Sequence, residues 1–98
     1  KIVAAAESYI GLVEVGVGLI PGAGGNLRML SRLTKKINTM MPGAFPVVQK
    51  AFETIGFAKV GTSANHSQSY GYLQEDDIIV LNRSHLIKHA KDVVLEMY

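Results

Sequence analysis

A glycine-rich run with a single carboxylate, from Glu14 to Gly25, places the strongest constraint on the fold of this 98-residue chain. Its letters are E-V-G-V-G-L-I-P-G-A-G-G, and an amphipathic stretch follows directly. So many glycines disfavour a long helix, and they let the backbone bend tightly and come close to a ligand. The first turn of the helix that follows offers N–H groups without intrahelical partners. The run therefore predicts a tight turn that holds one acid beside backbone donors.

Composition limits the chain to one small domain and argues against several kinds of partner. A domain of this size buries about two-thirds of its unfolded surface, yet 48% of the residues are hydrophobic. We therefore expect either a well-packed domain or apolar surface that belongs against further protein. A net charge of +2 is too small to indicate a nucleic-acid partner. The chain has no cysteine and no apolar run of the roughly 18 residues that span a membrane, so we expect a cytoplasmic location.

The spacing of apolar residues predicts an α/β, helix-rich chain. We expect strands over residues 2–6 and 78–81, and one helical turn near 10–14 in an otherwise extended or irregular 9–20. We expect a first helix from around 23–25 to about 37, a second from 46 that weakens at Gly56 and extends at most to Lys59, a third over 64–70, and a last helix that includes 86–97. Thr62-Ser63 and Gly71 suit the start and the end of the third helix, Asn38 is a reasonable stop for the first, and Asn82 or Ser84 would cap the last. Met40 to Gly43 form a predicted turn. The expected buried faces are Leu27, Leu30, Leu33 and Ile37; Val47, Val48, Ala51, Phe52 and Ile55; and Leu86, Ile87, Ala90, Val93, Val94 and Met97.

Two segments of the chain are similar to one known family. The string G-L-V-E-V-G-V-G-L-I-P-G-A-G-G resembles the second active-site segment of the enoyl-CoA hydratase/isomerase (crotonase) superfamily. In that family a glutamate, a few apolar residues and G-x-I-P-G-x-G-G precede a helix. The string S-A-N-H-S-Q-S-Y-G-Y-L resembles the family's S-A-x-x-A-x-x-x-G-x-L helix, with Ser67 at the usual alanine. The chain looks closest to the hydratase region of bacterial bifunctional 3-hydroxyacyl-CoA dehydrogenases.

The resemblance implies that residues 1–98 are the latter part of a crotonase-like domain, whose core is a repeated β-β-α spiral. The N-terminal half would lie upstream of Lys1. The family's first glutamate belongs to a G-G-G-x-E segment, which no part of this chain matches. The two backbone N–H groups that hold the thioester oxygen should also lie upstream. We therefore expect the 98-residue chain to be inactive by itself.

The resemblance also implies roles in the hydration of trans-2-enoyl-CoA, a step of fatty-acid β-oxidation. Hydration needs donors at the thioester oxygen, a base for the water and an acid for the α-carbon. Glu14 would be a general acid/base, Gly22 would place the water through its backbone N–H, and Pro21, Gly24 and Gly25 would shape the loop. The substrate would be an acyl-CoA thioester, and NAD would be used by a separate domain of the parent. We expect no cofactor to bind to this chain. We also expect the chain either to form a homo-oligomer or to pack against the missing half-domain.

Other interpretations of the same residues stay open. The parent could be an isomerase, which keeps only this glutamate, or the chain could be a non-catalytic assembly or binding module. Glu14 could be an exposed loop carboxylate, and Gly24 and Gly25 could serve close packing alone. Four cationic residues lie in the first predicted helix: Arg28, Arg32, Lys35 and Lys36. They could bind the phosphates of coenzyme A, or they could form a solvated cationic face that balances the helix dipole. His85 and His89 have metal-ligand spacing, but no third ligand is obvious, so we expect no metal.

Overall fold

A computed structural model of the chain describes residues 1–37 and 45–98. The elements are β1 (Val3–Ala5), β2 (Ile10–Gly11), the 3-10 turn η1 (Glu14–Val17), α1 (Gly25–Ile37), α2 (Phe45–Gly56), β3 (Val60–Gly61), α3 (Ala64–Tyr70), β4 (Ile78–Val80), the 3-10 turn η2 (Arg83–His85) and α4 (Leu86–Met97). The predicted α/β, helix-rich class is confirmed. The predictions for Asn38 and for the turn from Met40 to Gly43 fall outside the described residues. The β-β-α spiral stays a prediction.

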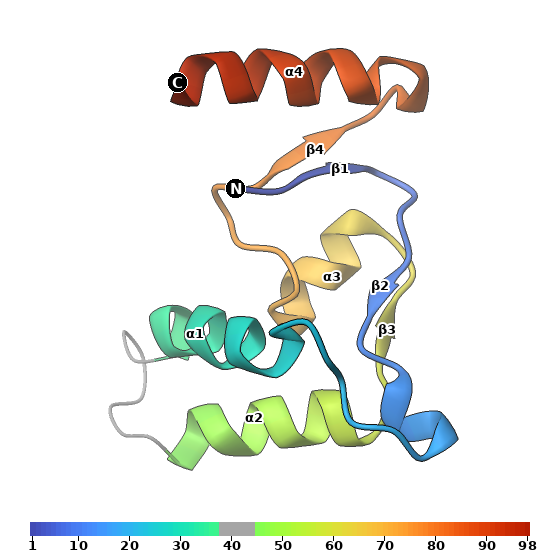
Figure 1. Cartoon of the computed structure of the whole chain (residues 1–98), viewed down its shortest axis with the longest axis vertical. Coiled ribbons are helices and arrows are strands. Elements are labelled where there is room, and N and C mark those ends of the chain that lie inside the picture. The colour runs from blue at the N-terminus through green and yellow to red at the C-terminus, as the bar shows by residue number, and fades with distance from the viewer. Residues whose placement is uncertain (38–44) are drawn as a thin grey trace.

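Helices α1 and α2 pack side by side at one end of the molecule, and α4 lies at the other end beyond β1 and β4 (Figure 1). Helix α3 lies between these two layers. The core accordingly has two parts. One cluster joins α1, α2 and the segment after α3, through Met29, Leu33, Val47, Ala51 and Tyr72. The second joins β1 to α3 and the same segment, through Ala4, Ala64 and Leu73.

Helices α1 and α2 form as the sequence predicts, and their expected buried faces are confirmed in part, since Leu33, Val47 and Ala51 are buried. Met29 and Leu33 are the buried residues of α1, whereas Leu27 is 70% exposed. In α2 the fully buried Thr54 takes the place expected for Phe52, which is 73% exposed. Each helix has more apolar positions at helical spacing than its contact with the other helix can bury. Periodicity alone therefore does not say which of these positions are buried. Helix α2 ends at Gly56 and does not reach Lys59.

Strands β1 and β4 form a parallel pair although they lie far apart in the sequence. The register places Ala4 opposite Ile79, and the Asp77 carboxylate accepts the N–H groups of Ile2 and Gln74, each at 2.8 Å. Asp77 is itself buried. One carboxylate therefore holds the first residues of the chain against the turn that precedes β4.

Helix α4 covers β1 without burying any of its own residues completely. Its expected buried face is wrong in part, because Ile87 is 84% exposed and Val94 and Met97 are also exposed. Asn82 caps η2 by accepting the Ser84 N–H at 3.1 Å, so it acts one turn before α4 begins. Within the described residues, α4 therefore packs mainly against β1 and the adjoining turn η2.

Strands β2 and β3 form a short antiparallel pair that the sequence did not predict. Ile10 lies opposite Gly61, and Gly11 lies opposite Val60. The pair leads into α3, whose predicted ends are confirmed. The Ser63 side chain accepts the His66 N–H, and Gly71 ends the helix with a φ of 89°. The expected helical turn near residues 10–14 is wrong, since β2 occupies 10–11 and the turn η1 begins at Glu14.

Candidate functional site

Glu14 lies at the start of η1, and the backbone around it is closely hydrogen bonded. The Leu19 N–H donates to the Glu14 carbonyl at 2.9 Å, and the Gly18 N–H donates to the Val15 carbonyl at 3.0 Å. Gly18 adopts a φ of 80°, a conformation that suits glycine. The turn therefore closes on itself directly after the carboxylate.

The Glu14 side chain is partly buried, and its Oε2 atom is out of reach of solvent. Within the residues that the structure describes, Oε2 makes no hydrogen bond. The hydroxyl oxygen of Thr54 on α2, a fully buried residue, likewise makes no hydrogen bond to the described residues. Buried polar atoms are nearly always satisfied, and leaving one without a partner is costly. The carboxyl group therefore has one buried oxygen whose hydrogen-bonding capacity the described residues leave unused.

Tyr72 connects the segment that carries Glu14 to two other parts of the fold. The phenol oxygen accepts the Leu12 N–H at 3.3 Å, and the hydroxyl donates to the Lys59 carbonyl at 2.7 Å. Burial raises the pKa of Tyr72 above its ordinary value of 10.0, and the nearby Glu14 carboxylate and Tyr70 raise it further. Only the Leu12 N–H opposes this change in pKa. Glu14 thus lies within electrostatic reach of a buried and fully hydrogen-bonded phenol.

The loop between η1 and α1 returns the chain from the edge of the molecule to the start of α1 (Figure 1). Pro21 is buried, and its carbonyl accepts a hydrogen bond from the Asn26 side chain at 3.3 Å. Ala23 and Gly24 both have positive φ, of 51° and 80°. The side-chain-poor bend expected here is therefore present, with a left-handed pair of residues just before α1.

Gly25 and Gly22 differ in their surroundings. A Cβ on Gly25 would lie 2.9 Å from a Leu12 methyl carbon, so this glycine lets α1 begin against the segment that leads to Glu14. Gly22 is exposed, and a Cβ there would meet nothing within 4 Å. Its carbonyl accepts the Gly25 N–H at 3.0 Å. The roles of Glu14 and Gly22 toward a substrate stay predictions.

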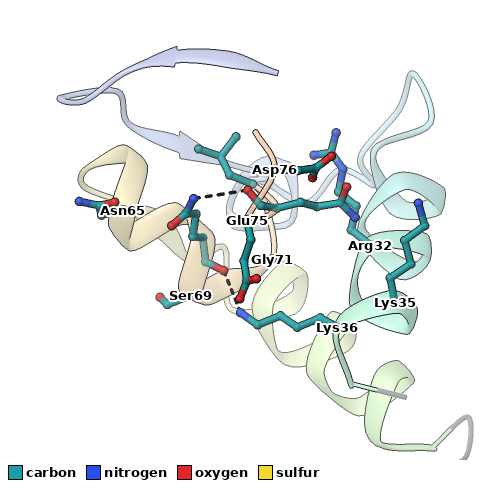
Figure 2. Close-up of a pocket in the computed structure, with 11 residues that line it drawn as sticks. Arg32, Lys35, Lys36, Asn65, Ser69, Gly71, Glu75 and Asp76 are labelled. Carbon is teal, nitrogen blue, oxygen red and sulfur yellow. Dashed lines mark hydrogen bonds between the residues drawn. The ribbon is translucent and has the colours of Figure 1, made fainter. Parts of the chain in front are cut away.

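A separate pocket of about 830 Å³ lies between α1 and α3, away from Glu14. Figure 2 shows Arg32, Lys35 and Lys36 extending from α1 toward it. Arg32 donates to the Tyr72 carbonyl, and Lys36 donates to the Gln68 carbonyl at 3.0 Å. Both carbonyls lie at the C-terminal end of α3 or just beyond it, where cations complement the helix dipole. Two of the four cations therefore stabilise the fold, whatever else they contact.

Two other groups from the sequence analysis are on the surface. His85 and His89 are exposed, and the described residues contain no cluster of three or more potential metal ligands. Tyr98, the last residue, is fully exposed. Among the described helices, none combines the length and the apolar character that crossing a membrane requires.

The chain is similar to part of one curated bacterial protein. It is 43% identical, over 100 aligned residues, to a probable 3-hydroxyacyl-CoA dehydrogenase of Bacillus subtilis (strain 168). The alignment covers the whole chain but only 12% of that protein, so the chain spans about an eighth of its relative's length. No protein-family model matches the chain, and no solved structure gives a significant match.

Tyr72 also belongs to the surroundings of Glu14, although no motif in the sequence points to it. Its ring is part of the larger core cluster. The hydroxyl, however, bridges two backbone groups whose neighbourhood depends on the β2–β3 pair. A tyrosine directly after a helix-ending glycine carries no local signal for that bridge, so only the tertiary structure reveals it.

Proposed function

We propose that this chain is part of a larger protein of the 3-hydroxyacyl-CoA dehydrogenase type and carries half of an enoyl-CoA hydratase site. Glu14 is the general acid/base that activates water or protonates the α-carbon of a trans-2-enoyl-CoA. The Gly22 N–H helps to place the water. The donors for the thioester oxygen and a second glutamate come from outside residues 1–98.

The observation that carries this proposal is the buried Oε2 atom of Glu14, which has no hydrogen-bond partner in the part of the chain that the structure describes. A solvated loop carboxylate would have both oxygens in water, whereas this one keeps an oxygen in a low-dielectric setting without a partner. A general base works best when its lone pair is free and aimed at the proton it takes. Similarity to a probable 3-hydroxyacyl-CoA dehydrogenase supports acyl-CoA chemistry for the larger protein. The resemblance of the glutamate-to-glycine run to the crotonase segment supports hydration specifically.

Replacing Glu14 with glutamine in the full-length protein tests the proposal. The amide keeps the shape of the side chain but cannot accept or deliver the proton, so we expect kcat for crotonyl-CoA hydration to fall about 10²- to 10⁴-fold. Glu7→Gln is the matched control, because Glu7 is an exposed carboxylate just after β1. Hydration that survives Glu14→Gln at the control rate would exclude Glu14 from the chemistry.

The same two variants separate hydration from the isomerase alternative. A 3-enoyl-CoA substrate reports double-bond migration, and crotonyl-CoA reports addition of water. The isomerase assignment would replace the hydratase assignment if two results occurred together. The wild-type protein would not hydrate crotonyl-CoA, and Glu14→Gln would abolish migration of the double bond.

A further inference from the structure

We propose that Tyr72 is a positioning residue for Glu14: its hydroxyl bridges Leu12 and Lys59 and so sets where the carboxylate-bearing turn begins. This inference rests on the proposed function of Glu14. It concerns a residue that lies 58 positions further along the chain (72 − 14) and does not touch the substrate.

The register of β2 and β3 shows why the bridge matters. Ile10 pairs with Gly61 and Gly11 pairs with Val60, so Leu12 and Lys59 would form the next pair of the ladder. The phenol oxygen instead lies between the Leu12 N–H, at 3.3 Å, and the Lys59 carbonyl, at 2.7 Å. The hydroxyl thus takes the place of a backbone partner for each strand. Beyond this point the two strands separate, and residues from Glu14 onward form η1.

The strands meet closely just before the bridge. A Cβ on Gly11 would lie 2.9 Å from a Val60 methyl carbon and 3.1 Å from the Lys59 carbonyl oxygen. On its other side Leu12 packs against Gly25, at the start of α1. Leu12 is therefore held through its N–H by Tyr72 and through its side chain by Gly25. Little freedom remains for a residue that precedes Glu14 by two positions.

The phenol itself is suited to holding and unsuited to proton transfer. Tyr72 is 6% exposed, and its hydroxyl donates one hydrogen bond and accepts another. Its proton is committed to the Lys59 carbonyl, and burial raises its pKa, so it stays protonated while Glu14 exchanges protons. Its ring is anchored in the core between α1 and α2.

Steady-state kinetics of the full-length protein on crotonyl-CoA test the inference, with Tyr72→Phe, Tyr70→Phe, Glu14→Gln and the double variant Glu14→Gln/Tyr72→Phe. Tyr70→Phe is the matched control, because the Tyr70 hydroxyl makes no hydrogen bond to the described residues. A displaced base costs rate rather than binding, so we expect Tyr72→Phe to lower kcat about 10- to 100-fold with KM unchanged. Adding it to Glu14→Gln should lower kcat no further, since Tyr72 acts through Glu14.

Three results would overturn the inference. In the first, Tyr72→Phe has the same kcat as Tyr70→Phe. In the second, Tyr72→Phe raises KM and leaves kcat unchanged. In the third, Tyr72→Phe lowers the kcat of Glu14→Gln by its full factor, as general structural damage does. Failure of the proposed function of Glu14 would give a different result from failure of the Tyr72 inference, because Glu14→Gln would then keep the full wild-type kcat.

A second measurement applies if Tyr72→Phe does not fold. A fluorinated tyrosine that ionises near neutral pH, placed at position 72, keeps the bridge only while protonated, because a phenolate cannot donate to the Lys59 carbonyl. The groups that face it are Glu14, Tyr70 and the Lys59 backbone. We expect kcat to fall as pH rises through the ionisation of the fluorophenol, with KM constant. A pH profile identical to that of the wild type would refute the positioning role.

Discussion

Two glycines with left-handed backbone show how differently single residues contribute to this fold. Gly18 ends η1 with a φ of 80°, and a Cβ there would meet nothing within 4 Å. Gly71 ends α3 with a φ of 89°, and a Cβ there would lie 2.6 Å from a Leu33 methyl carbon in the core. The first position therefore needs glycine for its conformation alone, and the second needs it for conformation and for space.

We expect Gly71→Ala to lower the free energy of unfolding by about 2–4 kcal/mol, because backbone strain adds to the displacement of Leu33. Gly18→Ala carries only the strain and should lower it by about 1 kcal/mol. Urea unfolding followed by circular dichroism measures both. Equal losses for the two variants would show that the contact with Leu33 has no energetic weight.

Packing between elements depends most closely on the approach of β3 to α3. A Cβ on Gly61 would lie 2.1 Å from Ser67 Oγ and 2.8 Å from Ser67 Cα, so strand and helix are in backbone contact. The buried Ser67 hydroxyl donates to the Ser63 carbonyl at 2.8 Å, within the same helix. A serine at this position is therefore satisfied locally. The close approach holds β3, and with it Lys59, against the helix that leads to Tyr72.

We expect Gly61→Ala to lower the free energy of unfolding by about 3 kcal/mol, because β3 must move away from α3. Ser67→Ala should not rescue it, since the contacts with Ser67 Cα and Cβ remain after the hydroxyl is removed. Gly56→Ala, at the exposed end of α2, is the control and should leave stability unchanged or raise it by up to about 1 kcal/mol. Rescue by Ser67→Ala, in the same unfolding experiment, would mean that the hydroxyl alone sets the spacing.

At the scale of the whole molecule, much apolar surface faces outward. Leu81, Ile87 and Val94 are exposed around α4, and Phe45, Phe52 and Phe57 are exposed along α2 and just beyond it. Exposed apolar side chains in such number on a small chain are typical of surfaces that contact further protein. Because the chain corresponds to 12% of its curated relative, residues outside it are the natural partners we propose for these surfaces.

We expect the purified 98-residue chain to leave crotonyl-CoA unchanged, whereas the full-length protein hydrates it. In the proposed site, Glu14 transfers the proton, but the hydrogen-bond donors for the enolate oxygen come from outside residues 1–98, so the isolated chain lacks them. Loss of the thioester-conjugated enoyl absorbance measures both samples at equal molar concentration. Turnover by the isolated chain would show that its own N–H groups complete the site.

Local patterns were enough to predict some of these elements. Ser63 and Gly71 delimit α3 because capping and left-handed termination act over a few residues. The apolar runs around Ala4 and Ile79 gave both strands of the parallel pair. The β2–β3 pair was missed, since two-residue strands leave no period to detect. The residues misplaced on α1 and α2, such as Leu27 and Phe52, have a similar cause: several apolar positions lie at helical spacing, and only packing decides which of them are buried.

The sequence by itself determined the helix-rich class, the positions of most helices and the glycine-rich bend after a lone acid, because each depends on neighbours within one or two turns. Only the tertiary structure decided that Glu14 keeps a buried oxygen without a hydrogen-bond partner among residues 1–37 and 45–98, and that Tyr72 holds the strand leading to it. The Tyr72 bridge joins residues 60 positions apart, and the burial of Glu14 likewise depends on how whole elements pack.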